Sequence, residues 1–274
     1  MPIIPPAMLA RKGARKPADV PREVLALLEK GEIETVNLSE WLALDQRKLI
    51  GNTFPAMGLE ELIPGLETVI DELKKATAIK VIEAVGEQLS EYALSECKTD
   101  ELFEKLSTHP ADTVRCYAPY LHARDSQLVV NEQLEKCLIS VSDAHFGVRE
   151  VAWMALRPSI AENLSLAIPF LEEWTRSMDE NVRRFTTEAT RPRGVWCTHI
   201  GELKEHPELA LPLLEMLKAD PARYVQNSVA NWLNDASKTR PDFVSDLTQS
   251  WLMESEGNKA TAYIVKRARR SLGK

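Results

Sequence analysis

The sequence predicts an all-α protein, an α-solenoid of stacked helix pairs with a concave groove. Glycine is sparse, at 11 of 274 residues, and apolar residues recur at spacings of three and four, as in amphipathic helices. Four similar segments align on Val114, Val148, Val182 and Val225, at separations of 34, 34 and 43 residues. A repeat of this length is typical of helix-pair arrays, in which each copy buries its apolar face against the next.

The chain divides into three expected parts. Residues 1–19 hold the stretch RKGARK and are expected to form a basic arm. Residues 20–97 contain amphipathic segments without an evident reactive group, and we expect a helical cap there. Residues 98–274 carry the repeats and are expected to form the solenoid with the groove.

Each repeat is expected to contain two helices in two layers. The first helices are VNEQLEKCLISV, LAIPFLEEW and ALPLLEML, and they would form one layer. The second helices begin near the aligned valines and would line the other layer. Prolines and stretches with Asp or Asn separate the helices, because these residues favour turns and helix ends.

Charge is distributed unevenly along the chain. The net charge is −7, but residues 1–180 hold 19 Lys and Arg against 30 Asp and Glu, which gives −11. Residues 181–274 hold 15 against 11, which gives +4. Binding of a polyanion depends on the local field rather than on the total charge, so the last third is the expected binding region.

Several classes of protein are disfavoured by composition. No apolar run approaches 18 residues, so no membrane span is expected. The apolar patch at the amino terminus precedes its basic residues, the reverse of a secretory signal, which predicts a cytoplasmic protein. The four cysteines stand far apart without a C-x-x-C motif, so neither a metal site nor a disulfide framework is expected.

An arginine follows the aligned valine in three copies, as Arg115, Arg149 and Arg183. Helix N-termini attract anions through their free N–H groups and the helix dipole. Three arginines at a fixed period therefore predict a track for phosphate groups. The alternative is that they pair with nearby acids such as Glu150 or reach solvent.

The stretch NVRRFTTEATRPRGVW begins as a helix and ends in a corner. Pro192 lacks an N–H and pushes Arg191 out of the α region, so the helix is expected to end there. Gly194 lets the chain turn. The corner would then project Arg191, Arg193 and Trp196, and arginine with an aromatic side chain commonly binds a nucleic-acid strand.

Polar side chains surround this corner. Glu188 lies one turn before it and can reach Arg184 or Arg191 along the helix. The next second helix, RYVQNSVANWLNDASK, places Asn227, Asn231 and Asp235 at a spacing of four. Asparagine is a poor helix former, so these side chains are expected to be fixed hydrogen bonders. They would serve either the binding surface or the junction between repeats.

The stretches RRFTTEATRPRGVW and YVQNSVANWLNDASKTRPDFV resemble the DNA alkylation repair proteins with HEAT-like repeats. This family includes AlkC and AlkD, and the resemblance is closest to the AlkC branch over about residues 110–274. It implies a HEAT-like solenoid that binds duplex DNA as a monomer. It also implies hydrolysis of the N-glycosidic bond of cationic alkylated purines, such as 3-methyladenine and 7-methylguanine, without a metal or other cofactor and without a deep base pocket.

The resemblance also implies the roles of individual residues. Asp235 would be the carboxylate that stabilises positive charge on the deoxyribose and orients water, with Glu188 as the alternative. Trp196 would contact the lesion by stacking or cation–π attraction. The side chains expected to contact DNA are Arg115, Arg149, Trp153, Arg183, Arg184, Arg191, Arg193, Asn231 and Lys238.

Three departures from the family pattern keep other functions open. Trp153 stands where the pattern has an acid, Ala189 where it has glycine, and Gly194-Val195 where it has Leu-Pro. The sequence favours a glycosylase, but Trp153 favours the alternative of a non-catalytic module that binds damaged or distorted DNA. A protein-binding scaffold is a second alternative, which the combination of arginine, tryptophan and aspartate disfavours.

Overall fold

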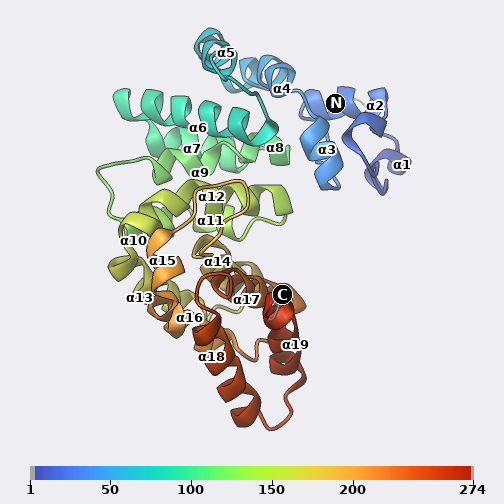
Figure 1. Cartoon of the computed structure of the whole chain (residues 1–274). Coiled ribbons are helices and arrows are strands. Elements are labelled where there is room, and N and C mark those ends of the chain that lie inside the picture. Colours follow the sequence, from blue (N-terminus) through green and yellow to red (C-terminus); the bar gives the residue numbers. More distant parts are fainter. Residues whose placement is uncertain (1–3, 273–274) are drawn as a thin grey trace. The chain divides into compact units, whose positions relative to one another are not determined.

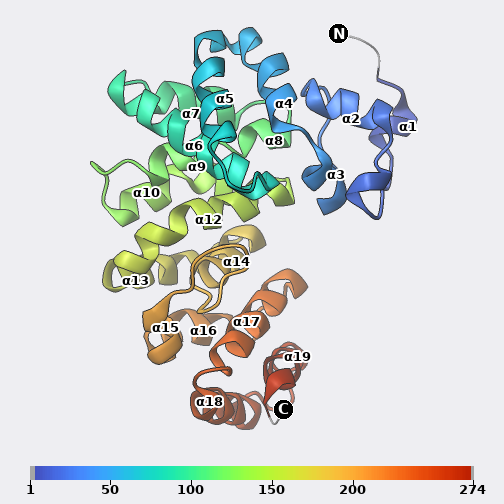
Figure 2. The ribbon, with the colours of Figure 1, turned by 45° about the horizontal axis from the view of Figure 1, so that its top comes forward.

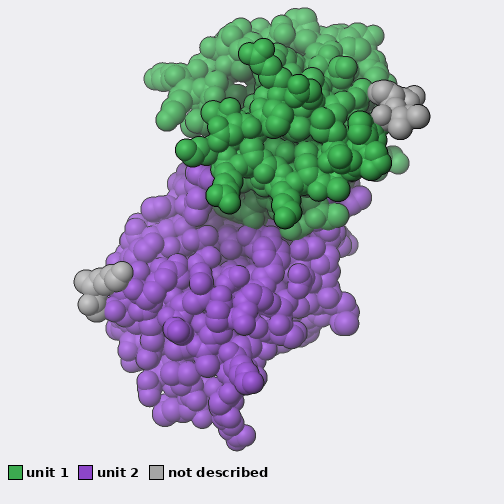
Figure 3. Space-filling model, turned by 90° about the vertical axis from the view of Figure 1, so that its right-hand side faces the viewer, with its two compact units in different colours: residues 1–127, 144–155 green, residues 128–143, 156–274 purple. Residues whose placement is uncertain are grey.

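The computed structural model describes residues 4–272, and within them every regular element is a helix (Figure 1). The predicted all-α class is therefore confirmed. The chain forms two compact units, drawn in different colours in Figure 3. Unit 1 comprises residues 1–127 and 144–155, and unit 2 comprises residues 128–143 and 156–274. The division into an arm, a cap and a solenoid at residues 19 and 97 stays a prediction.

Unit 1 is built around the long helix α6 (Ala78–Ser95), which packs against α5 and α9. Gly86 of α6 allows this close approach, because a Cβ there would lie 2.3 Å from the Tyr120 ring. The other helices wholly within unit 1 are α1 (Pro6–Leu9), α2 (Arg22–Glu29), α3 (Leu38–Ala43), α4 (Gln46–Thr53), α5 (Ile63–Asp71), α7 (Thr99–Ser107), α8 (Asp112–Arg115) and α9 (Ala118–Ala123), with 3₁₀ turns η1 (Pro17–Asp19), η2 (Pro55–Met57) and η3 (Glu60–Leu62).

The expected basic arm is docked by one of its arginines. Arg11 donates two hydrogen bonds to the carboxylate of Glu40, at 2.9 and 2.7 Å, and a third to the carbonyl of Glu34. The Arg11 side chain is only 11% exposed. The part of the arm around Arg11 therefore packs against the cap, because a buried carboxylate needs a cationic partner.

Unit 2 contains the predicted repeats as two rows of helices (Figures 1 and 2). Helix α13 contacts α10 and α16, while α17 packs against α14 and α19. The predicted first helices LAIPFLEEW and ALPLLEML and the second helices at Val182 and Val225 are thus found in this unit, whereas VNEQLEKCLISV is divided at Cys137 into α10 and α11. Its helices are α10 (Val130–Lys136), α11 (Leu138–Val141), α13 (Leu164–Trp174), α14 (Glu180–Ala189), α15 (Gly201–Glu205), α16 (Leu211–Leu217), α17 (Arg223–Ala236), α18 (Pro241–Glu254) and α19 (Lys259–Ala268), with 3₁₀ turns η4 (Pro207–Ala210) and η5 (Arg269–Ser271).

Proline affects two of the second helices differently from the simple expectation. The helix at the first aligned valine is split into α8 and α9 just before Pro119, which cannot donate a backbone hydrogen bond. In contrast, α12 (Phe146–Glu162) continues through Pro158. None of the helices described for residues 4–272 combines the length and apolar character needed to cross a bilayer.

Candidate functional site

The site is built on the packing of α14 against α17 in unit 2. Asp179 caps the start of α14 by accepting a hydrogen bond from the Asn181 N–H at 2.8 Å. The two helices are joined by buried polar pairs. Thr187 and Ser228 share a hydroxyl hydrogen bond of 2.6 Å, and the Trp232 indole donates to the Thr190 carbonyl at 2.9 Å. These directional contacts fix the register in which the ends of the helices face each other.

A network of alternating charges lies where α14 ends beside α17. Arg191 donates from Nε and Nη2 to Asp235 Oδ2, at 2.8 and 2.6 Å, and from Nη1 to Glu188 at 3.3 Å. Arg184 lies 3.5 Å from the other Glu188 oxygen, and Lys238 donates to Asp235 Oδ1 at 2.9 Å. The structure thus brings together five of the predicted site residues, and Glu188 reaches both of its expected partners.

Burial strengthens this network. The Glu188 and Asp235 side chains are each 5% exposed, while Arg191 is 13% exposed. Burial by itself lowers the pKa of the Arg191 guanidinium, but Glu188 and Asp235 outweigh it and raise that pKa above its ordinary value. Arg191 therefore stays charged, and it holds both carboxylates in place.

The corner after α14 is organised by an arginine that sequence reasoning missed. Arg157 of α12 is 3% exposed and donates to the backbone carbonyls of Ala189, Arg191 and Thr198, at 2.8, 2.5 and 3.0 Å. It satisfies the free carbonyls at the end of α14, as basic side chains do at helix C-termini. Burial lowers the pKa of Arg157, against the opposing effect of Cys197.

A periodic signal could have identified Arg157. The steps Arg157-Pro158 and Arg191-Pro192 stand 34 residues apart, which is the repeat period. Proline alone does not end the helix, since α12 runs through its own Arg-Pro step. The end of α14 at Ala189 coincides instead with the carbonyls that Arg157 binds.

The tip of the corner exposes an indole on strained backbone. Trp196 is 54% exposed and has φ +64°, a left-handed conformation that is uncommon for a bulky residue. Gly194 serves tight packing rather than a left-handed turn: a Cβ there would lie 2.2 Å from the Cys197 sulfur and 3.1 Å from the Arg157 guanidinium. Arg193 is half-buried beside it. The predicted projection of Trp196 is therefore observed, on a corner that Arg157 fixes from inside. The predicted projection of Arg191 is wrong, because its guanidinium turns to Asp235 and Glu188 and is only 13% exposed.

The arginines that follow the aligned valines are used within the fold. Arg115 donates to the carbonyls of His109 and Pro110 and to Glu34. Arg183 likewise donates to the carbonyls five and six residues before it, and its Nε bonds Asp220 at 2.6 Å. Arg149 donates to the carbonyl of Ala144. The shared role is to brace the turn before each second helix. Phosphate binding by these residues stays a prediction.

Arg183→Met is expected to destabilise the protein by about 3 kcal/mol, because it leaves the buried Asp220 carboxylate without its cation. The Asp220 side chain is 3% exposed, and its hydrogen bond raises the pKa of Arg183. Urea unfolding would measure the loss. Arg176→Met is the matched control, since Arg176 is 47% exposed in its ion pairs and its loss should change stability by less than about 1 kcal/mol. Equal losses in both variants would contradict the bracing role.

The asparagines of α17 are fixed hydrogen bonders, and they join repeats. Asn227 accepts a hydrogen bond from the Tyr263 hydroxyl at 2.7 Å, and Asn231 accepts one from Arg270 at 3.0 Å. Both partners come from the next helix pair. Asn227 therefore serves the junction between repeats, which was the alternative prediction. Asn231 instead orients the exposed guanidinium of Arg270.

Trp153 does not present its ring to solvent. It is 2% exposed, and its indole N–H donates to Glu150 at 2.8 Å. An acid therefore does lie beside Trp153, three residues earlier on α12. Direct contact between Trp153 and DNA stays a prediction, and the buried ring does not support it.

Stacked arginines on α14, α17 and α19 form a surface that sequence reasoning missed in part. Arg184 lies over the ring of Tyr224 with its Cζ 4.2 Å from the centroid. Arg223 and Arg267 both lie against Tyr263, at 3.6 and 5.6 Å. Each stacked pair is worth up to about 1 kcal/mol at an exposed site. Since stacking uses the face of a guanidinium, its N–H edge is left for anions.

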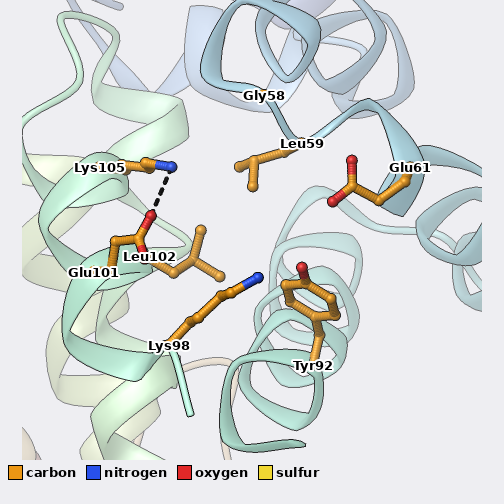
Figure 4. A pocket seen from close by; sticks show the side chains of 8 residues that line it. All are labelled: Gly58, Leu59, Glu61, Tyr92, Lys98, Glu101, Leu102 and Lys105. Atoms are coloured by element: carbon orange, nitrogen blue, oxygen red, sulfur yellow. Dashed lines mark ion pairs between the residues drawn. The ribbon is translucent and has the colours of Figure 1, made fainter. Parts of the chain in front are cut away.

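A shallow pocket in unit 1 is no alternative site (Figure 4). It has a volume of about 70 Å³, well below the roughly 300 Å³ typical of the smaller ligand pockets. Figure 4 shows Lys98 beside Tyr92, and Lys105 paired with Glu101 at 3.0 Å. Its charges are thus mixed and partly paired. None of its lining residues was predicted as a site.

Comparison with solved structures supports this architecture. The chain is similar to Pseudomonas fluorescens alkylpurine DNA glycosylase AlkC bound to DNA containing an abasic site analog, with a TM-score of 0.64 and 23% identity over 91% of this chain and 62% of that one. It is also similar to AlkD2 from Streptococcus mutans, with a TM-score of 0.57 and 26% identity over 78% of this chain and 99% of that one. The predicted solenoid class is thereby confirmed.

Sequence comparison identifies the family. The chain is 38% identical over 118 residues to the uncharacterized protein YhaZ of Bacillus subtilis (strain 168), a match that covers 43% of this chain and 32% of YhaZ. The chain thus spans about a third of that relative and under two thirds of AlkC. The family described as DNA alkylation repair enzyme matches residues 134–272, which hold the whole charge network and the corner. This chain belongs to the DNA alkylation repair enzyme family.

Proposed function

We propose that this protein is a DNA glycosylase that hydrolyses the N-glycosidic bond of cationic alkylated purines in duplex DNA. The observation that carries the proposal is the buried carboxylate of Asp235, held by Arg191 at the start of the corner whose tip exposes the indole of Trp196. The proposed substrates are 3-methyladenine and 7-methylguanine, and the protein would act as a cytoplasmic monomer without a cofactor. The family membership and the AlkC and AlkD2 likenesses support this assignment.

The chemistry suits a carboxylate of this kind. Alkylation gives the purine a positive charge, so the base is already a good leaving group. Breaking the glycosidic bond then places positive charge on the deoxyribose. Asp235 stabilises this charge and orients the attacking water, since a preorganised carboxylate in a partly dry site acts strongly on developing charge. Both oxygens of Glu188 lie near buried arginines. One oxygen of Asp235 pairs instead with Lys238, which is 44% exposed, so Asp235 is the better candidate for acting on the substrate.

The stacked arginines supply the proposed contact with the DNA backbone. Arg223, Arg267 and Arg270 belong to neighbouring helices and are half-buried or exposed. We propose that they bind phosphates together with Arg193 of the corner and Lys238. Stacking and hydrogen bonds hold them in place, so little side-chain entropy is lost when phosphates bind. Arg115 and Arg183 bind carboxylates within the fold, and Trp153 is buried. Contact of these three side chains with DNA would require them to leave their partners.

The proposal is tested by the products of methylated DNA. Purified protein in excess over a methylated duplex is expected to release free 3-methyladenine or 7-methylguanine, detected by chromatography, and to leave abasic sites. Unmethylated duplex serves as the control and should release no base. If methylated duplex yields no free base at any enzyme excess, the glycosylase assignment is lost.

A second candidate function is binding of damaged or distorted DNA without cleavage. Trp153 favours this second function. It stands at a position that is acidic in the family pattern, so a buried indole that donates to Glu150 replaces the carboxylate expected there. This reading predicts tight binding with a steep salt dependence but no base release. Gel shifts over a range of salt concentrations, run beside the release assay, separate the two functions. The absence of any DNA binding would leave only the protein-scaffold reading.

A further inference from the structure

Lys238 covers the oxygen of Asp235 that Arg191 leaves open. Arg191 directs two hydrogen bonds to Oδ2, whereas Lys238 Nζ donates to Oδ1 at 2.9 Å. Lys238 follows the end of α17 at Ala236, and its side chain is 44% exposed. Of the two cations that bind the Asp235 carboxylate, Lys238 is therefore the more exposed.

The cations of the network differ in how firmly they are held. Arg184 and Arg191 are 12% and 13% exposed, and each bonds or stacks with other groups. Lys238 is far more exposed, and within the described residues its ammonium donates one hydrogen bond, to the Asp235 carboxylate. A lysine ammonium on a flexible stem is also more easily displaced than a planar, stacked guanidinium. Lys238 is thus the displaceable member.

Removing Lys238 lowers the net charge of the network from +1 to zero. With Lys238 in place, the network holds three cations and two carboxylates. Without it, two buried arginines balance Glu188 and Asp235, and Oδ1 is open as an acceptor. A positively charged group can then bind at Oδ1, while a neutral group gains nothing from displacing the ammonium.

We propose that Lys238 marks the position of the substrate's positive charge and competes with cationic groups for Asp235 Oδ1. This inference rests on the proposed glycosylase function. The Lys238 ammonium occupies Asp235 Oδ1 in the free protein and yields it to the cationic sugar or base. The displaced ammonium moves to a backbone phosphate. Lys238 therefore lowers the preference for cationic groups by competing with them for Oδ1, and it does not attack the substrate.

The test compares two probes that differ in charge. One duplex carries a neutral tetrahydrofuran abasic analogue, and the same duplex carries a cationic pyrrolidine analogue instead. The dissociation constants of both are measured at one salt concentration, and their ratio reports preference for the cation. Any loss of general phosphate contact cancels in this ratio. Wild type, Lys238→Met, Lys238→Arg, Asp235→Asn and the control Lys218→Met are compared. Lys218 directly follows α16 and pairs with Glu215 of that helix and with Glu254 of α18.

The expected results follow from competition for Oδ1. Lys238→Met raises the preference for the cationic probe about fivefold, the factor that corresponds to an ion pair of about 1 kcal/mol. Lys238→Arg and Lys218→Met leave it near the wild-type value, and Asp235→Asn brings it close to 1. Lys238→Met with an unchanged or lower preference overturns the inference. Base release by the wild type is measured on the same preparations. If it persists in that case, only the role of Lys238 is lost. If it is absent, the glycosylase function fails.

Discussion

Asp235→Asn is expected to slow release of the methylated base at least about 100-fold, the loss seen when a preorganised stabilising group is removed. The amide keeps the size of the side chain and can still accept from Arg191, but it cannot balance positive charge on the deoxyribose. DNA affinity should change less than about threefold, since Asp235 is not expected to contact phosphates. Single-turnover rates with enzyme in excess measure the effect without interference from product release.

Glu188→Gln is the matched variant for this experiment. Both carboxylates are 5% exposed and both bond Arg191, so loss of either should affect folding to a similar extent. A thermal melt of each variant checks that the protein remains folded. If Glu188→Gln abolishes base release while Asp235→Asn keeps a rate within tenfold of wild type, the carboxylate that acts is Glu188.

Arg157→Met is expected to destabilise the protein by about 3 kcal/mol, because three backbone carbonyls, one of them in a buried hydrogen bond, lose a charged donor. Base release should fall further than stability explains, since the corner that presents Trp196 and Arg193 loses its internal support. Urea unfolding and single-turnover rates, both taken where the variant is folded, separate these two effects. The methionine fills a similar volume, so the lost hydrogen bonds dominate.

Arg157→Lys sharpens this test. Its single ammonium keeps the charge but cannot span the carbonyls of Ala189, Arg191 and Thr198 as a planar guanidinium does. Base release should therefore remain impaired although the charge is conserved. Arg47→Met is the control, since Arg47 is 36% exposed and pairs with the exposed Asp71. Full activity of Arg157→Lys would show that only the charge at this position matters.

Features set by local spacing could be predicted from the sequence. The alignment of the repeats on their valines predicted the helix pairs at Val182 and Val225 in unit 2, because the period of apolar residues decides which faces are buried. The reach of Glu188 to Arg184 and Arg191 also follows from helical spacing alone. The projection of Trp196 at the corner was predicted as well, although the expected reason, proline and a free glycine turn, was incomplete.

Features set by distant partners could not be predicted. Arg115 pairs with Glu34, which is 81 residues away, and Arg183 pairs with Asp220, which is 37 residues away. A periodic arginine indicates a repeated role but does not say whether its partner is a phosphate or a carboxylate. The stacking of Arg223 on Tyr263 likewise depends on how α17 packs against α19. Such pairings arise only when the helices are assembled.

The anchoring of the corner by Arg157 limits how the activity can be transplanted. The carboxylates and the indole come from α14, its following corner and α17, yet the guanidinium that shapes the corner comes from the preceding helix pair. A chimera that receives α14 to α17 alone would inherit the reacting groups without their scaffold. Grafting into another solenoid therefore needs a donor segment that starts upstream of Arg157.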